Sequence, residues 1–313
     1  MQHSPASKLP RRPRGLAALL ATLMAAAGSV ACSSTEPAPE SEPFVEPQAT
    51  PPDTTGFLLA KLDTQVRGWQ NLKHTARSNK DHRNMRALER QLAQEASERR
   101  DDLLAELESP SRKNRSIAAV ALGFSGDPEV VGPLYAALGD PEPNVANNAL
   151  IGLGILADPA TPMSRICFLL TSAEEGDTRI NAAFALGAIV GSGGRDPEVE
   201  PACLLALDDP EGGVRAQAAG VLGRLKSERA ITTLGDLLYD ESALVTRAAA
   251  ASLAAIALAH DTELGNIARL MTGAAARRKK DAKLVILNEM VRLSDKNWGD
   301  DVDEWVEWAH RLP

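Results

Sequence analysis

Aromatic residues are scarce in this sequence: Phe, Trp and Tyr make up only 4% of its 313 residues. A core without them has to be built from Leu, Ala, Val and Ile, which suits closely packed helices better than sheets rich in aromatic and β-branched side chains. With 44% hydrophobic residues, the chain still has ample material for a folded body. The scarcity therefore predicts an all-α fold.

Cysteines are also few, and their odd number, three, does not fit a disulfide framework. Cys167 and Cys203 each stand twelve residues before an arginine, Arg179 and Arg215. They therefore occupy equivalent places in what we interpret below as neighbouring units. Equivalent positions on stacked helices lie about 8–10 Å apart, beyond the roughly 7 Å that a disulfide allows between Cα atoms. We expect two free, buried thiols.

The usual signatures of catalysis are missing as well. The five histidines form no pair at helical spacing that would bind a metal, and the sequence has no Gly-rich phosphate loop, nucleophile elbow or recognisable triad. We expect no metal, no cofactor and no enzyme activity, although a triad assembled from distant residues stays open.

The chain is acidic, with a formal net charge of -8. The first 31 residues contain four basic residues and no acid, so residues 32–313 carry 30 basic and 42 acidic side chains, a net of -12. A surface of this sign does not attract nucleic acid, and we expect no nucleic-acid partner.

Residues 1–31 have the layout of a secretory signal peptide: a basic start, an apolar run from Leu16 to Ala27, and small residues up to Ala31. The run is too short to span a bilayer, which needs roughly 20 apolar residues. Its end, directly before Cys32, resembles the lipobox of bacterial lipoproteins, and this implies a lipid on Cys32. Ser29 stands where that family usually has Leu, so ordinary cleavage after Ala31 is the alternative.

Residues 32–56 combine this cysteine with a linker that contains six prolines, five acids and no Lys or Arg. Such a composition cannot bury enough apolar surface to order itself, so we expect an extended spacer.

One phrase of small and aliphatic residues recurs in the remainder of the chain. It reads Ala-Ala-Val-Ala-Leu-Gly up to Gly123, and variants end at Gly154, Gly187 and Gly223. Its leucines, with two degenerate copies included, are Leu122, Leu153, Leu186, Leu222, Leu253 and Leu287. Spacings of 31 to 36 residues are typical of a solenoid.

Each phrase ends a helix, and a second apolar stretch precedes it, so each unit is predicted to be a helical hairpin. The preceding stretches are 130–138, 162–170, 199–207, 231–238 and 264–271. Asp-Pro dipeptides, such as Asp127-Pro128 and Asp209-Pro210, lie where helices begin, because Asp caps free N–H groups and Pro tolerates the first helical position.

Residues 98–293 resemble the HEAT-repeat family, especially its short bacterial type also labelled phycobilisome-lyase-like. Asp209-Pro210 with Val214-Arg215 and Ala218-Ala219 look like the Asp-Pro, Val-Arg, Ala-Ala signature of that family. The resemblance implies a right-handed α-solenoid over 109–293. It also implies a ladder of Arg–Asp pairs between adjacent repeats, for which the candidates are Arg115, Arg179, Arg215, Arg247, Asp140, Asp177, Asp209 and Asp240. A ligand-binding row of arginines is the alternative.

The ends of the array have their own patterns. Residues 57–108 show two amphipathic helical stretches, which we interpret as an N-terminal hairpin that covers the start of the solenoid. Three of the four tryptophans lie within 294–313, which predicts a short C-terminal capping helix, with recognition by exposed Trp as the alternative.

Two basic segments are candidates for partner binding, each with a solvated helix face as the alternative. Residues 67–100 carry nine basic and four acidic side chains, which suits an acidic partner or anionic lipid. The candidate residues are Arg67, Lys73, Arg77, Lys80, Arg83, Arg86, Arg90, Arg277, Arg278, Lys279 and Lys280.

We therefore expect a non-enzymatic scaffold of the bacterial envelope that binds a protein or peptide partner along its second helices. The chain is expected to face the periplasm from the inner or outer membrane, held there by its lipid. Two alternatives stay open: an enzyme or enzyme accessory resembling the phycobilin lyases, and an envelope-structural protein that contacts an anionic polymer.

Overall fold

The computed structural model describes residues 54–313, apart from the side chains of His74 and Lys280. The predicted signal peptide, Cys32 and the linker up to residue 53 lie outside the described residues. Within the described part every regular element is helical, as the composition predicts. No helix of this part is long and apolar enough to cross a membrane.

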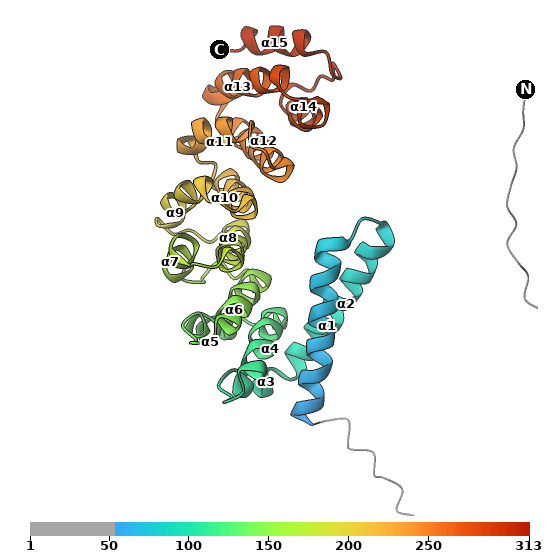
Figure 1. Cartoon of the computed structure of the whole chain (residues 1–313), viewed down its shortest axis with the longest axis vertical. Helices are drawn as coiled ribbons and strands as arrows, with labels where there is room; N and C mark the ends of the chain where they lie inside the picture. Colours follow the sequence, from blue (N-terminus) through green and yellow to red (C-terminus); the bar gives the residue numbers. More distant parts are fainter. Residues whose placement is uncertain (1–53) are drawn as a thin grey trace, which may run out of the picture. The chain divides into compact units, whose positions relative to one another are not determined.

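Two long helices come first and are followed by six helical pairs and a last short helix (Figure 1). The opening pair is α1 (Thr55–Thr75) and α2 (Asn79–Glu98). The first helices of the six repeats are α3 (Arg100–Leu107), α5 (Val131–Ala137), α7 (Ser164–Ser172), α9 (Val199–Leu205), α11 (Ile231–Leu237) and α13 (Leu264–Arg277). The second helices are α4 (Arg112–Leu122), α6 (Pro143–Leu156), α8 (Gly176–Gly191), α10 (Gly212–Leu225), α12 (Ala243–Ala257) and α14 (Lys280–Ser294). The chain ends with α15 (Val302–Arg311).

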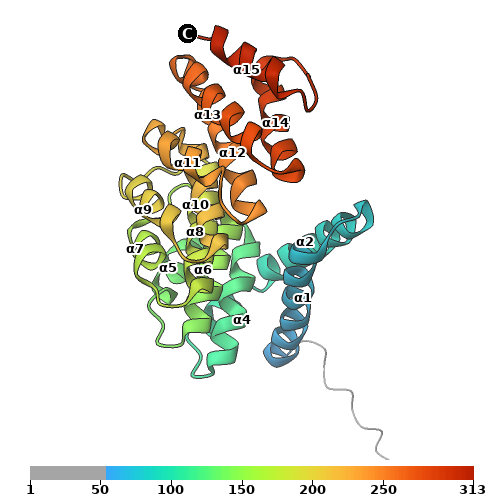
Figure 2. The same ribbon diagram turned by 45° about the horizontal axis from the view of Figure 1, so that its top comes forward.

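The helical pairs stack in chain order, with the first helices on one side and the second helices on the other (Figures 1 and 2). The predicted first helices match the observed ones within two residues at each end, except that α13 extends six residues beyond its predicted end, to Arg277. The leucines of the repeated phrase all lie in second helices and are at most 2% exposed. The chain is therefore an α-solenoid, and its period is the one that the sequence predicts.

Small residues in the phrase let adjacent second helices touch through their backbones. A Cβ atom added to Gly123 would lie 2.4 Å from the carbonyl oxygen of Gly152, and one added to Gly152 would lie 2.4 Å from that of Ala119. Farther along, Ser252 donates its hydroxyl to the carbonyl oxygen of Ala219, 2.8 Å away and buried between α12 and α10. Gly and Ala are required at these positions because a larger side chain has no room.

The aspartates of the Asp-Pro dipeptides fix the turns between helices. Asp127 caps a short 3-10 helix (Pro128–Val130) by accepting the N–H of Glu129. Asp140 and Asp209 accept the N–H groups of Glu142 and Glu211, at 2.9 and 2.8 Å. These two aspartates lie two residues before the N-cap residues of α6 and α10, Glu142 and Glu211, which form no side-chain capping bond, so the aspartates fix the turn and do not cap these helices, contrary to the prediction.

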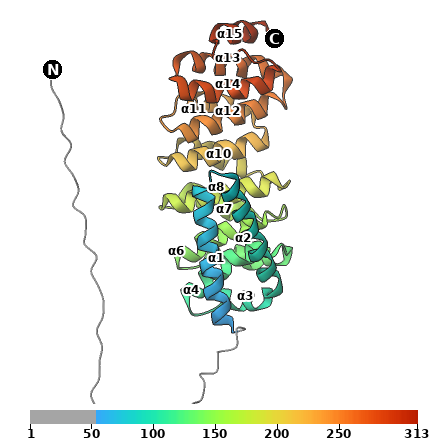
Figure 3. The same cartoon turned by 90° about the vertical axis from the view of Figure 1, so that its right-hand side faces the viewer.

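The N-terminal hairpin packs against the first repeat and also extends along the side of the next repeats. Figure 3 shows α1 and α2 lying in front of α4, α6 and α8, on the side of the second helices. Trp69 of α1 meets Phe124 edge-on, with ring centroids 5.2 Å apart, and Lys73 reaches Phe184 of α8 in the third repeat. The hairpin therefore covers part of the surface that we expected to be open for a partner.

The C-terminal helix is a lid, as its tryptophans predict. α15 packs against α13, and Trp305 is fully buried there. The ring of Trp298 meets it edge-on at 4.7 Å, and the Trp305 indole N–H donates to the carbonyl oxygen of Gly299. Trp308 packs against the same two rings, so the tryptophans close the last repeat.

Replacing Leu186 with Ala should destabilise the protein by about 2–5 kcal/mol, because this fully buried side chain fills the space between stacked repeats. Denaturant unfolding followed by circular dichroism measures the change. Leu205→Ala is the matched control, since Leu205 is 71% exposed on α9 and should change stability by less than about 0.5 kcal/mol. Equal effects for the two variants would contradict the repeat register.

Candidate functional site

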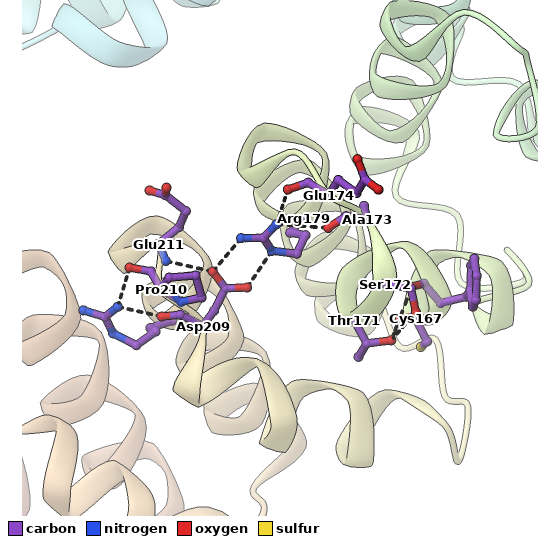
Figure 4. A network of polar contacts seen from close by, with 11 residues as sticks. Cys167, Thr171, Ser172, Ala173, Glu174, Arg179, Asp209, Pro210 and Glu211 are labelled. Atoms are coloured by element: carbon purple, nitrogen blue, oxygen red, sulfur yellow. Dashed lines mark hydrogen bonds and ion pairs between the residues drawn. The ribbon is translucent and has the colours of Figure 1, made fainter.

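Three arginines near the starts of second helices form ion pairs with the next repeat. Arg179 binds both carboxylate oxygens of Asp209, at 2.6 Å from Nε and 3.0 Å from Nη2. Its Nη1 donates to the carbonyl oxygens of Ala173 and Glu174, at 3.0 and 2.8 Å (Figure 4). Arg115 pairs with Asp140 and Arg215 with Asp240 in the same geometry. The structural ladder is thus present at these three rungs.

Two of the predicted members stand outside the ladder. Asp177 is exposed in the first turn of α8, and Arg247 is exposed on α12 without an ion pair in the described part of the chain. The position equivalent to Arg215 is Thr246, one residue earlier than Arg247, and Thr246 lies 3.4 Å from the carbonyl oxygen of Asp240. The prediction for both residues is therefore wrong: Arg247 lies one residue after the arginine position, and Asp177 lies four residues after the aspartate position, which is Ala173 in this repeat.

Hydrogen bonds and burial set the charge state of the ladder. The Arg115 side chain lowers the pKa of Asp140 below its ordinary value near 3.8, against the opposing effect of burial. At Asp209 and Asp240 burial acts to raise the pKa, but the bonds from Arg179 and Arg215 and from the turn N–H groups outweigh it. These pairs thus stabilise the fold above the unfolded-state pKa and lose their contribution only as pH falls through the lower folded-state values.

The second candidate site is a cavity of about 690 Å³ between the N-terminal hairpin and the repeats, which we call the hairpin cleft. Its apolar floor comes from three repeats: Phe124 follows α4, Ile155 and Leu156 end α6, and Phe184 lies on α8. Its opposite wall belongs to α1 and α2. The lining residues of that wall are Trp69, Lys73, Met85, Arg86, Glu89, Arg90 and Ala93.

Aromatic rings surround the ammonium group of Lys73 in this cleft. Its Nζ lies 3.6 Å from the ring centroid of Phe184 and 5.1 Å from that of Trp69, within the range of a cation–π interaction. Burial lowers the pKa of Lys73, and the nearby charge of Glu89 opposes the shift. Glu89 also accepts the indole N–H of Trp69 at 3.0 Å, which fixes the wall of the cleft.

The other basic residues of the hairpin divide into paired and unpaired ones. Arg67 is held by Asp63 at 2.8 Å, and Arg77 donates to the Ala76 carbonyl oxygen at 3.0 Å. The remaining ones lie exposed on α2 and form no ion pair within residues 54–313; they are Lys80, Arg83, Arg86 and Arg90. Only Arg86 and Arg90 among these line the hairpin cleft.

A polar cavity of about 530 Å³ lies on the other flank of α1, and its charges satisfy one another. Asp63 binds Arg67 and also Lys113 at 3.5 Å, while Arg112 lies 3.6 Å from Glu142. With its lining ions already paired, this cavity offers less to a charged partner than the hairpin cleft does.

The second basic run, 277–280, contributes to the solenoid itself. Arg278 donates to the carbonyl oxygens of Tyr239 and Asp240, at 3.1 and 2.9 Å, so it occupies the place that an arginine at Thr246 would fill. Arg277 reaches the hydroxyl of Tyr239 at 3.5 Å, and Lys279 is the exposed N-cap residue of α14. The side chain of Lys280 lies outside the description.

The remaining chemically active side chains are structural. Cys167 and Cys203 are free and buried, as the sequence predicts. Burial raises the pKa of Cys167 to about 12 and also raises that of Cys203, so both remain neutral thiols. No cluster of His, Cys, Asp and Glu suited to a metal occurs among residues 54–313.

Sequence analysis missed the floor of the hairpin cleft. Phe184 occupies the third position of the repeated phrase, where other copies have Val120, Ile151 and Gly220. An aromatic residue there, in a chain with few aromatics, was a usable signal. Phe124, Ile155 and Leu156 follow or end second helices, and nothing in the local sequence marks them as parts of one surface.

A family model described as HEAT repeats matches residues 100–163 and 165–254. These residues therefore form HEAT-type repeats, in agreement with the resemblance noted in the sequence. No curated protein matches the chain.

Several solved structures resemble the chain. An archaeal HEAT-like repeats protein from Thermococcus onnurineus NA1 has 15% identity and a TM-score of 0.48, over 82% of this chain and 100% of that one. The complex of CpcE and CpcF of phycocyanin lyase from Nostoc sp. PCC7120 has 20% identity and a TM-score of 0.41, over 87% and 100%. A designed armadillo repeat protein in complex with the peptide (KR)4 has 16% identity and a TM-score of 0.44, over 63% and 99%.

Replacing Arg215 with Ala should destabilise the protein by about 1–3 kcal/mol, because the carboxylate of Asp240, only 7% exposed, would lose its guanidinium partner. The free energy of unfolding in denaturant at neutral pH measures this. Arg247→Ala removes the same side chain from the same side of the next repeat, where it has no ion pair, and should change stability by less than about 0.5 kcal/mol. An equal loss in both variants would show that the rungs of the ladder contribute nothing specific.

Proposed function

We propose that the chain is a non-enzymatic interaction scaffold of the bacterial cell envelope, which is exported, anchored to a membrane through Cys32, and binds a protein or peptide partner. The observation that carries this proposal is the hairpin cleft, in which Arg86 and Arg90, which form no ion pair within residues 54–313, stand beside an apolar floor. A stable fold alone does not require this combination, and such surfaces mark sites of interaction.

The distribution of shifted pKa values supports a role in binding over one in catalysis. Three shifted aspartates belong to the Arg–Asp ladder, Asp127 is held by Arg100, and the shifted cysteines are buried between helices. Burial lowers the pKa of Lys73, whose ammonium group packs between two rings. None of these groups forms a nucleophile and base at hydrogen-bond distance, which covalent catalysis would need.

Repeat arrays bind partners through extended surfaces that supply many modest contacts. In this chain the second-helix side is partly covered by α1 and α2, so the hairpin supplies one wall of the binding surface and the repeats supply the other (Figure 3). A partner would thus be bound between them.

A photo-crosslinking amino acid in place of Arg90 should yield a discrete adduct with a partner in intact envelopes, because Arg90 lines the hairpin cleft. The control is the same amino acid in place of Leu205, which is exposed on a first helix away from the cleft. Adducts resolved by electrophoresis and identified by mass spectrometry are the readout. No adduct at Arg90, or the same adducts at both positions, would remove the support for this scaffold role.

For the membrane anchor, Cys32→Ser should abolish labelling of the protein with a radioactive fatty acid and release it into the soluble fraction. The expected cause is the loss of the thiol that would carry the lipid. Cys167→Ser, which alters a buried thiol, is the control and should keep the label. Continued membrane retention of the Cys32→Ser protein would point to another anchor.

A further inference from the structure

The cations of the hairpin cleft outnumber its acids. Lys73, Arg86 and Arg90 line the cleft, and Glu89 is the one acid among its lining residues. Glu89 already accepts the indole N–H of Trp69. Neither arginine forms an ion pair with any residue of 54–313, whereas Arg67 of the same hairpin is paired with Asp63. The cleft therefore carries a net positive charge in an acidic protein.

Helical spacing extends this charge along α2. Arg83, Arg86 and Arg90 follow one another by three and four residues, so they lie on one face of the helix. Over seven residues an α-helix rises about 10 Å, a length that about three residues of an extended chain span. Several acidic side chains of one short segment can thus meet these cations together.

The apolar floor lies beside these cations and below the rim of the cleft. Phe124 is 8% exposed, and Ile155, Leu156 and Phe184 are half-buried. An extended polypeptide can place one bulky side chain against this floor while its neighbouring side chains reach the cations. A volume of about 690 Å³ is within the range of sites that hold a small ligand or a few side chains.

We propose that the hairpin cleft binds an extended acidic peptide segment that carries one bulky apolar side chain. The apolar side chain lies against Phe124 and Phe184, and carboxylates on either side of it bind Arg86 and Arg90. This deepens the proposed function and rests on it, since it names the chemistry of the partner. A basic segment is repelled by the same cations, and an apolar segment without acids leaves them unused.

The test uses the full chain carrying Cys32→Ser and calorimetric titration with a capped peptide, Gly-Glu-Glu-Phe-Glu-Glu-Gly. The wild-type cleft should bind this peptide with an affinity that falls as salt rises, because the contacts are ionic. A peptide with Ala in place of Phe should bind at least about tenfold more weakly, and one with Lys in place of Glu should not bind at about 1 mM.

Arg86→Glu combined with Arg90→Glu should weaken binding of the acidic peptide at least about tenfold and allow the Lys peptide to bind. The matched control is Arg247→Glu with Lys296→Glu, which makes the same change of net charge at two exposed positions outside the cleft and should leave binding unchanged. Unchanged circular dichroism spectra and melting temperatures establish that the variants are folded. Phe184→Ala should weaken binding of the acidic peptide several-fold, because it removes part of the apolar floor and leaves the arginines in place.

Three outcomes would overturn the proposal: no binding of the acidic peptide, equal binding by the Ala peptide, or equal loss in both double variants. Binding of phosphatidylglycerol vesicles that is lost in the Arg86 and Arg90 variant, without peptide binding, would assign the cations to a membrane and overturn it too. A crosslinked partner at Arg90 that the acidic peptide fails to displace would contradict this inference while leaving the scaffold function intact. Absence of any crosslinked partner would count against the function itself.

Discussion

Backbone contact between neighbouring second helices is the constraint on which the remainder of this structure depends. Gly123 faces the backbone of Gly152, and Gly152 in turn faces that of Ala119, so a side chain of any size would force the helices apart. This spacing explains why Gly and Ala recur in the repeated phrase beside its recurring leucine, Leu122 in the first copy. It also explains the shortage of aromatic residues, because the interior of such a stack has no room for them. Phe184 is accommodated because it lies over Gly154, where a Cβ would meet its ring at 2.5 Å.

Close stacking places the starts of the second helices against the turns of the next repeat, and the Arg–Asp ladder follows from that. A cation near a helix N-terminus opposes the helix dipole, so each arginine needs compensation. Each arginine obtains this compensation by binding both oxygens of one carboxylate in the next repeat and by donating to carbonyl oxygens of its own turn. Between the second and third repeats the Arg position is Ala146 and the Asp position is Ala173. Both partners are absent together, which indicates that the pair is the structural unit, since an unpaired, partly buried ion would be costly.

Much of the fold could be predicted because its causes are local and repeat. A leucine every 31 to 36 residues marks the units whatever the rest of the chain does, and an aspartate precedes three of the six second helices, α6, α10 and α12. Three rungs of the ladder were predictable, whereas Arg247 lies one residue after the arginine position, occupied by Thr246, and Asp177 lies four residues after the aspartate position, occupied by Ala173. The hairpin cleft could not be predicted in the same way. Its floor combines Phe124, Ile155 and Phe184 from three repeats, and its wall lies up to about a hundred residues earlier in the sequence. Only the packing of α1 across the second helices brings these parts together.

The apolar stripe of α1 shows why a cleft forms at this point. Leu58, Leu62, Val66 and Trp69 are buried at helical spacing, and the next position on the stripe is Lys73. A leucine at this position would let the hairpin seal against Phe184, as the earlier residues of the stripe seal against the first repeat. Lys73 instead brings an ammonium group to the apolar floor. Burial lowers the pKa of Lys73, the charge of Glu89 opposes that shift, and the ring faces of Phe184 and Trp69 lie against the ammonium group. A cation between these rings, beside arginines that form no ion pair within residues 54–313, is better explained by a ligand that completes the site than by the stability of the fold.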